Sequence, residues 1–294
     1  MAKVISIIAK KGGCGKSETA MDLSYGLGCQ GKKVLLCDAD PQGNTTGIVL
    51  GIDQEMNEES VNEFHDLYRS FLTDKEDAFM AAYKALQKVV EKGHIIHDMH
   101  DVLENNCTIK EAIQKTRFSN VDIVPASSQL LMTDLALKSS MNPSNRLRRA
   151  IQEIEDSYDY VIIDNQPFEN SLTYNAMAAC YKEGDLIIIP TKINRGGLEG
   201  TYGTLTTALE WLQVEQLGYD VRILITMTNR NRVDQKWTQA LQEAFGEYVF
   251  QTTIRYQAKP VQEASLKREI LLERSKSGVA DDYRKLVEEI LQMS

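Results

Sequence analysis

The hydrophobic positions along the chain form a series of short apolar runs, rich in β-branched residues and separated by polar segments. Continuous apolar runs of this length are typical of strands buried on both faces of a parallel sheet. Most of the intervening segments place apolar side chains at helical spacing, and strands that alternate with helices favour a parallel sheet covered on both faces. Six runs are predicted to be strands: Val4–Ile8, Val34–Cys37, Val121–Val124, Val161–Ile163, Leu186–Ile189 and Val221–Ile225.

Residues 52–100 interrupt this alternation. The segment is polar, acidic at first and helix-prone, and it contains no strand candidate. We therefore predict a helical insertion between the second and third strands of one α/β domain that spans residues 1–294. Its simplest roles are those of a lid or an interaction surface.

Composition narrows the class of protein further. The chain of 294 residues carries a formal net charge of −9, and no apolar run approaches the roughly 18 residues of a membrane span. The apolar stretch at the N-terminus is too short for a signal peptide, so we expect a cytoplasmic protein. The five cysteines contain no CxxC pair, which argues against structural zinc and against a disulfide framework.

The strongest candidate for chemistry is the glycine-rich segment 12–17, "GGCGKS", between the first predicted strand and a helical pattern. Glycines let backbone N–H groups approach phosphates, and the helix N-terminus adds positive potential. Lys16 would contact the β- and γ-phosphates of ATP, and Ser17 would place its hydroxyl on Mg²⁺. The residues expected to line the nucleotide here are Gly12, Gly13, Cys14, Gly15, Lys16, Ser17 and Glu18.

Carboxylates follow two further predicted strands. Asp38 and Asp40 lie where "VLLCDADPQGN" leaves the second strand, and Asp164 ends the apolar run of "YVIIDNQP". Open α/β sheets place their ligand chemistry at the carboxyl ends of strands. The Asp-Pro-Gln-Gly sequence is also good turn chemistry, so a structural role for Asp40 is the alternative.

These motifs together resemble those of the ParA/MinD superfamily of P-loop ATPases. "KGGCGKS" fits the deviant Walker A pattern KGGxGK[ST], "DADPQGN" resembles the second motif, and "VIIDNQP" resembles Walker B, with Asn165 and Gln166 as mild departures. The resemblance covers nearly all of the chain outside 52–100. It includes a tail over 245–291 that resembles a strand, a loop before a Glu-Ala dipeptide and a closing amphipathic helix.

The resemblance implies roles for individual residues. Lys16 would serve its own ATP, whereas Lys11 would reach across a dimer interface to the partner's nucleotide, so that ATP drives homodimer assembly. It assigns Asp40 to the attacking water. Asp38 and Asp164 would lie at Mg²⁺, partly through water, and Asn229 is the candidate adenine contact.

Within the superfamily, the acidic C-terminal sequence "DDYRKLVEEILQMS" disfavours the membrane helix of MinD-like members. The ParA branch implies nonspecific DNA binding by the ATP-bound dimer, stimulation by a ParB-like centromere-binding partner, and a nucleoid-associated partition ATPase. Basic residues that could contact DNA phosphates are Arg230, Arg232, Lys236, Arg255, Lys259, Lys267, Arg268, Arg274 and Lys276.

Several alternatives remain open at this stage. The same ATPase could position another cargo, or it could be an ATP-gated scaffold that docks partners on residues 52–100. A redox or metal-cluster ATPase would use Cys107 and Cys180 together with the histidines of "HIIHDMH", which are His94, His97 and His100. Glu18 also stands where relatives usually have threonine, and its charge is expected to weaken or slow nucleotide use.

Overall fold

The computed structural model consists of two compact units, residues 1–51 with 97–294 and residues 52–96. The structure describes residues 1–52, 58–72, 77–90, 95–139, 143–167, 169–274 and 276–293.

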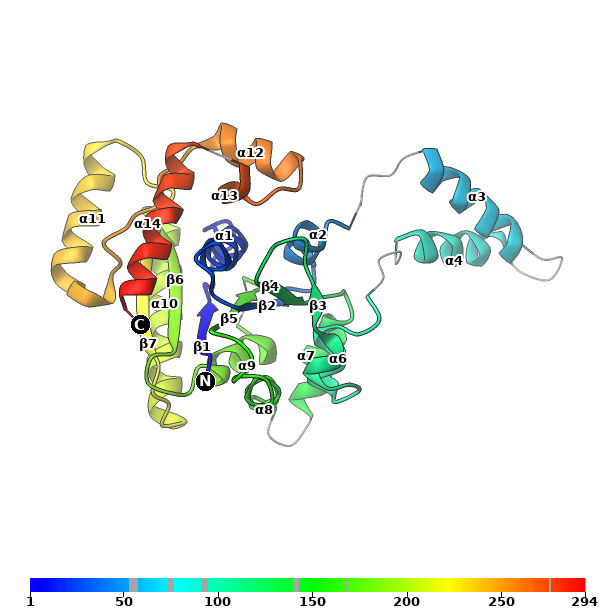
Figure 1. The fold of residues 1–294 in the computed structure, drawn as a ribbon, viewed down its shortest axis with the longest axis horizontal. Coiled ribbons are helices and arrows are strands. Elements are labelled where there is room, and N and C mark those ends of the chain that lie inside the picture. The colour runs from blue at the N-terminus through cyan, green and yellow to red at the C-terminus, as the bar shows by residue number, and fades with distance from the viewer. Residues whose placement is uncertain are drawn as a thin grey trace. The chain divides into compact units, whose positions relative to one another are not determined.

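A seven-stranded sheet in the described part of the chain organises the first unit (Figure 1), in the order β3-β4-β2-β5-β1-β6-β7. Every pairing is parallel except the antiparallel pairing of β3 with β4. The six predicted strands are all present. The two-residue edge strand β3 was not predicted, because it contains no apolar run. The strands are β1 (Lys3–Ile7), β2 (Val34–Ala39), β3 (Gln114–Lys115), β4 (Val121–Val124), β5 (Tyr160–Asn165), β6 (Leu186–Lys192) and β7 (Asp220–Thr226).

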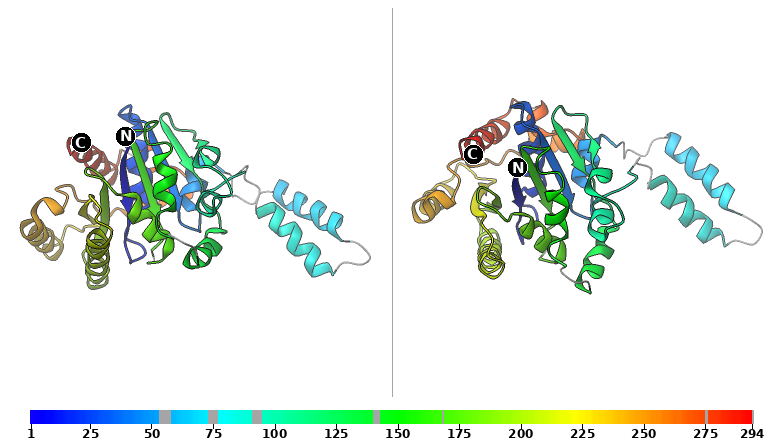
Figure 2. Two further views of the ribbon diagram at one scale, coloured as in Figure 1. Left: turned by 90° about the horizontal axis from the view of Figure 1, so that it is seen from below. Right: turned by 60° about the horizontal axis from the view of Figure 1, so that its bottom comes forward.

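Helices cover both faces of this sheet, as the strand–helix alternation predicts (Figure 2). One hydrophobic core lies between the sheet and α1, α12, α13 and α14, and a second lies between the opposite face and α5, α7, α8, α9 and α10. These helices are α1 (Lys16–Cys29), α5 (Met99–Glu104), α7 (Leu130–Lys138), α8 (Arg146–Gln152), α9 (Ser171–Ala179), α10 (Arg195–Val214), α12 (Ala258–Leu266), α13 (Leu271–Arg274) and α14 (Gly278–Gln292). The remaining elements of the unit are α2 (Asn44–Leu50), α6 (Ile109–Ala112), α11 (Arg232–Phe245) and the 3₁₀-helix η1 (Gly246–Tyr248).

The tail departs from the expected strand. After η1, Val249 makes one isolated bridge to Ile223, and no strand forms among the described residues of this segment. The carboxylate of Glu289 on α14 instead accepts hydrogen bonds from the backbone N–H groups of Gln251 and Thr252, at 2.8 and 2.9 Å. The segment still hydrogen-bonds β7, from the N–H of Phe250 to the carbonyl of Ile223 and from the N–H of Ile254 to that of Ile225, and Glu289 satisfies two donors that lie between them.

The second unit contains the helical insertion that the sequence predicts. Two helices, α3 (Glu58–Phe71) and α4 (Ala78–Val90), pack against each other as a hairpin. The described residues of this unit contain no strand.

Candidate nucleotide site

The glycine-rich loop joins β1, at the centre of the sheet, to the first turn of α1. Gly13 and Gly15 have φ angles of +70° and +88°, a region that side chains with a Cβ rarely adopt. Gly15 is the residue before the helix, and because glycine has no side chain, the first N–H groups of α1 receive no side-chain cap. A helix N-terminus with uncapped N–H groups is an anion site, and Lys16 at its first position is buried.

Asp38 and Asp164 lie side by side at the carboxyl ends of β2 and β5, since the two residues are register partners. Both are fully buried. Asp38 accepts hydrogen bonds from the N–H of Thr46 at 2.9 Å and from its hydroxyl at 2.7 Å. Burial, followed by the charge of Asp164, raises the pKa of Asp38 to about 7.

Asp164 has one oxygen engaged and one without a partner. The hydroxyl of Thr45 donates to Oδ2 at 2.7 Å, whereas the buried Oδ1 has no hydrogen-bond partner among the described residues. Burial raises the pKa of Asp164 to about 6, and the nearby hydroxyls of Thr45 and Ser17 act in the opposite direction. A buried oxygen without a partner is costly, and beside a serine hydroxyl and a second carboxylate it fits a ligand of Mg²⁺ or of its water.

Asp40 differs from this pair in its exposure. It is half-buried, and its Oδ1 accepts a hydrogen bond from the N–H of Gln42 at 2.9 Å. Its charge contributes to the raised pKa of Asp164, which places the two carboxylates close together. Asp40 is therefore adjacent to the buried pair and closer to solvent, where it could contact a water molecule.

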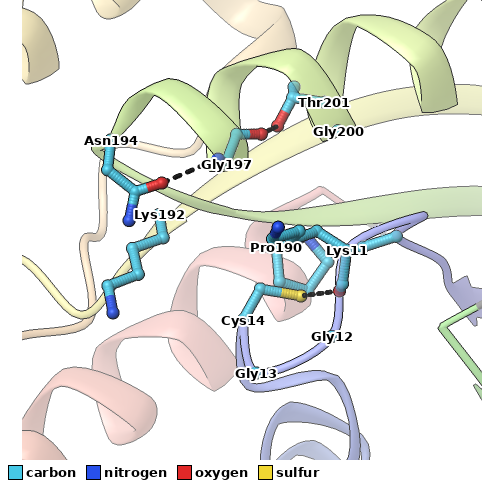
Figure 3. Close-up of a pocket in the computed structure, with 11 residues that line it drawn as sticks. Lys11, Gly12, Gly13, Cys14, Pro190, Lys192, Asn194, Gly197, Gly200 and Thr201 are labelled. Carbon is cyan, nitrogen blue, oxygen red and sulfur yellow. Dashed lines mark hydrogen bonds between the residues drawn. The ribbon is translucent and has the colours of Figure 1, made fainter.

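Lys11 lies over the start of α10, beside a cavity of about 110 Å³ that the loop and α10 line (Figure 3). A Cβ built on Gly200 would lie 3.0 Å from the Cβ of Lys11, and one built on Gly196 would lie 3.3 Å from its Nζ. The two glycines thus provide the space that this exposed side chain occupies. Sequence reasoning missed this contact, although the spacing of four between the glycines at a helix start was visible.

The neighbouring lysine has a different environment. Lys10 forms an ion pair with Glu169, which also accepts a hydrogen bond from Thr207 on α10 at 2.8 Å. The backbone N–H of Lys10 donates to Thr204 at 3.1 Å. Lys10 is therefore tied to its own chain by several contacts, which distinguishes it from Lys11.

The candidate adenine and DNA contacts lie after β7 and in the C-terminal helices. Asn229 is exposed and donates to Asp234 from both its backbone N–H and its side chain. Arg255 donates to both carboxylate oxygens of Asp282, at 2.7 Å each, and is thus committed to a structural ion pair. The exposed basic candidates are Arg230, Arg232, Lys236, Lys259, Lys267, Arg274 and Lys276; Arg268 is half-buried.

The histidines and cysteines do not form a metal centre in the described residues, where no group of three or more potential ligands is close enough to hold an ion. His100 shares a 2.7 Å hydrogen bond with Thr133, and His97 lies 3.5 Å from Asp101. Cys180 is fully buried next to backbone carbonyls. His94 falls outside the described residues.

Glu18 faces another carboxyl on its own helix. Burial raises the pKa of Glu18 to about 7, and Glu18 in turn contributes to the raised pKa of the fully buried Asp22, four residues on. The N–H of Leu272 donates to Oδ1 of Asp22 at 2.8 Å. The pair therefore favours the protonated state, which reduces the charge that Glu18 would bring to the loop.

This raised pKa predicts a pH-dependent stability. The folded chain retains the proton of Glu18 up to a pH of about 7, whereas the unfolded chain releases it near pH 4.5. The stabilisation that this proton gives to the folded state is therefore complete below pH 4.5 and is lost as the pH rises through about 7. The difference between these two pKa values corresponds to about 3 kcal/mol in the free energy of unfolding. We expect Glu18→Gln to flatten the free energy of unfolding between these pH values in denaturant titrations without nucleotide. Glu288→Gln, at an exposed position on α14, is the control, and identical slopes for wild type and Glu18→Gln would contradict the prediction.

The fold and the loop together define a P-loop nucleoside triphosphatase. A family model described as an AAA domain matches residues 2–217, which is more than half of the chain, and the chain therefore belongs to this family. No helix in the described part of the chain has the length and apolar character needed to cross a membrane.

Similar proteins identify the branch of this class. The sporulation initiation inhibitor protein Soj of Bacillus subtilis is 29% identical to this chain, over an alignment that covers 99% of this chain and 98% of Soj. The chromosome partitioning protein ParA of Caulobacter vibrioides is 27% identical, covering 98% and 94%. A crystal structure of cobyrinic acid a,c-diamide synthase from Mycobacterium smegmatis with bound ADP and magnesium shares the fold, with a TM-score of 0.71, 21% identity and coverage of 99% and 95%. The chain is a ParA-type ATPase.

Proposed function

We propose that the protein is a partition ATPase that dimerises with Mg-ATP, binds DNA without sequence preference and hydrolyses ATP when a ParB-like partner stimulates it. The exposed position of Lys11 is the observation that carries this proposal, because a lysine beside the phosphate loop that makes no ion pair in the described residues is available to a second subunit. In this proposal the protein is cytoplasmic and associates with the nucleoid.

The nucleotide half of the proposal is supported by the buried groups of the site. Lys16 and the N-terminus of α1 would hold the phosphates of ATP. Ser17, Asp38 and Asp164 would hold Mg²⁺, which fits the oxygen of Asp164 that lacks a hydrogen-bond partner among the described residues. Bound Mg²⁺ would supply charge compensation for the phosphates, and its own charge would oppose the protonation of the two buried carboxyls.

In hydrolysis, Asp40 would orient the attacking water, while Lys11 of the second subunit would stabilise the charge that develops on the phosphoryl group. Release of phosphate would remove the ligand on which Lys11 acts, so the dimer would separate. In this proposal, hydrolysis and dissociation are therefore coupled through Lys11.

Nonspecific DNA binding is supported by two groups of exposed cations. One group lies before and at the start of α11 and comprises Arg230, Arg232 and Lys236, and the other lies on and after α12 and includes Lys259 and Lys267. Dimerisation doubles these cations, and each neutralised phosphate steepens the salt dependence of binding by about 0.9 in log–log slope. Arg255 would support this surface through Asp282 rather than contact phosphate itself.

Sedimentation velocity with ATP–Mg²⁺ and with ADP–Mg²⁺ tests the proposal. We expect a dimer with ATP and a monomer with ADP at the same dilute concentration. A sedimentation coefficient that is the same with both nucleotides, although both bind, would favour the scaffold alternative. The cargo is proposed to be a DNA element, because the full-length relative named ParA is a chromosome partitioning protein.

A further inference from the structure

A lysine that does not belong to the phosphate-loop motif lies beside the loop. Lys192 is the last residue of β6, is half-buried, and lines the cavity of about 110 Å³ together with Gly13 and Cys14. Figure 3 shows its side chain extending away from α10, on the side on which the loop lies. The β6 strand therefore brings a further lysine to the surroundings of the loop, in addition to Lys11 and Lys16.

The backbone at Lys192 is fixed by the elements on both sides of it. Lys192 is the register partner of Thr226 on β7, and the hydroxyl of Thr226 donates to the carbonyl of Cys14 in the loop at 2.9 Å. The carbonyl of Lys192 accepts a hydrogen bond from the N–H of Asn194 at 2.8 Å. A Cβ built on Gly197 would lie only 2.1 Å from the same carbonyl oxygen. This close approach of α10 to β6 requires a glycine, and it holds the base of the Lys192 side chain at a defined place beside the loop.

Lys192 has no counter-charge in the part of the chain that the structure describes. No carboxylate there lies within ion-pair distance of its ammonium group, whereas Lys10 at the start of the loop pairs with Glu169. A half-buried ammonium group has lost part of its hydration, and without an anion that loss is not offset. A bound nucleotide would supply the missing negative charge through hydrogen bonds to its phosphate oxygens.

The order of the strands decides which part of a nucleotide Lys192 would face. The loop follows β1, which lies between β5 and β6 in the sheet. The candidate Mg²⁺ ligands Asp38 and Asp164 lie at the carboxyl ends of β2 and β5, on one side of β1. Lys192 ends β6 and Asn229 follows β7, on the other side. Since Mg²⁺ bridges the β- and γ-phosphates, the phosphate chain would run from β5 across the loop, and its α-phosphate would lie toward β6.

We propose that Lys192 is a further nucleotide-binding residue, which contacts the α-phosphate of the nucleotide bound in its own subunit. The inference rests on the nucleotide half of the proposed function and is independent of dimerisation and DNA binding. Because ATP and ADP share the α-phosphate, Lys192 would stabilise both complexes alike. Lys11 would instead act on the transferring phosphoryl group of the partner's nucleotide, so the two lysines that line one cavity would have separate tasks.

The test is the affinity for ADP–Mg²⁺ and for a non-hydrolysable ATP analogue with Mg²⁺, measured by calorimetry. We expect Lys192→Gln to raise both dissociation constants by about tenfold, the loss of one hydrogen bond to a charged group. Turnover at saturating ATP should stay within a few-fold of wild type, because a contact made equally to substrate and transition state changes KM rather than kcat. This separates Lys192→Gln from Lys11→Ala, which is expected to lower turnover.

Two further variants and a salt series distinguish a charge contact from a structural role. Lys192→Arg keeps the positive charge and should bind both nucleotides within about threefold of wild type. Lys32→Gln makes the same change at a half-buried lysine before β2, at the opposite end of the sheet, and should behave as wild type. The affinity of wild type for ADP should fall more steeply with salt than that of Lys192→Gln, since salt screens only the charge that the variant lacks.

Equal ADP affinity in wild type and Lys192→Gln would overturn the proposal. A loss confined to the ATP analogue would also overturn it, because it would place Lys192 at the γ-phosphate or at the nucleotide of the second subunit. If Lys192→Gln does not fold, Lys192→Met removes the same charge, and a loss that Lys192→Arg shares in full would show that the charge is not the cause. Nucleotide binding that Lys192→Gln weakens, in a protein that neither dimerises nor binds DNA, would support this inference and contradict the partition role.

Discussion

Lys11→Ala is expected to lower ATP turnover by about 10³-fold, since a cation supplied in trans to the transferring phosphoryl group is worth at least that much in related reactions. The side chain is exposed and lies over Gly196 and Gly200 without an ion-pair partner among the described residues, so its removal should leave the fold intact. The measurement is phosphate release at saturating ATP–Mg²⁺, accompanied by sedimentation to follow the dimer.

The control for this substitution is the adjacent residue. Lys10→Ala removes an equal charge from the same loop, but Lys10 pairs with Glu169 of its own chain. Its turnover should stay within a few-fold of wild type. Equal losses in the two variants would show a general effect of charge near the loop and would contradict the assignment of Lys11 to the second subunit.

Asp40→Ala is expected to reduce turnover by about 10²-fold or more, the usual contribution of a group that positions or deprotonates a nucleophile. ATP affinity should change little, because Asp40 lies outside the buried pair formed by Asp38 and Asp164. The ATP-bound dimer should therefore accumulate, which fluorescence binding of a nucleotide analogue and sedimentation can measure together.

Gln42→Ala separates this role from local structure, because the N–H of Gln42, rather than its side chain, binds Asp40. That variant should turn over ATP normally. If Asp40→Ala instead lost ATP binding in parallel with turnover, Asp40 would be a structural residue of the turn, which is the alternative that its Asp-Pro-Gln-Gly context allows.

The strands and the phosphate loop were predictable because each has a local signature. Continuous β-branched runs predicted six strands. Glycines before Lys16 predicted a phosphate loop, and the positive φ angles of this loop require glycine at Gly13 and Gly15. The contacts that modify the site are not local. The packing of Lys11 over Gly200 joins residues almost 190 positions apart, and the spacing of Gly196 and Gly200 does not by itself identify the side chain that lies over them.

The insertion shows the same contrast between local sequence signatures and long-range contacts. Its helical character followed from composition, whereas the exposure of Phe79 and the burial of Ala81 depend on which side of α4 meets α3. In the tail, residues with strand character pair with β7 only at isolated positions, and Glu289, nearly forty positions away, accepts the hydrogen bonds of Gln251 and Thr252 between them. Long-range partners of this kind override local propensity.

The most direct test of the proposed function is binding to a nonspecific DNA duplex with ATP–Mg²⁺ and with ADP–Mg²⁺ across a series of salt concentrations, for wild type and Lys11→Ala. The account predicts tight binding that weakens steeply with salt, only with ATP and only when Lys11 is present. Absence of DNA binding in both nucleotide states, in a protein that still binds ATP, would contradict it.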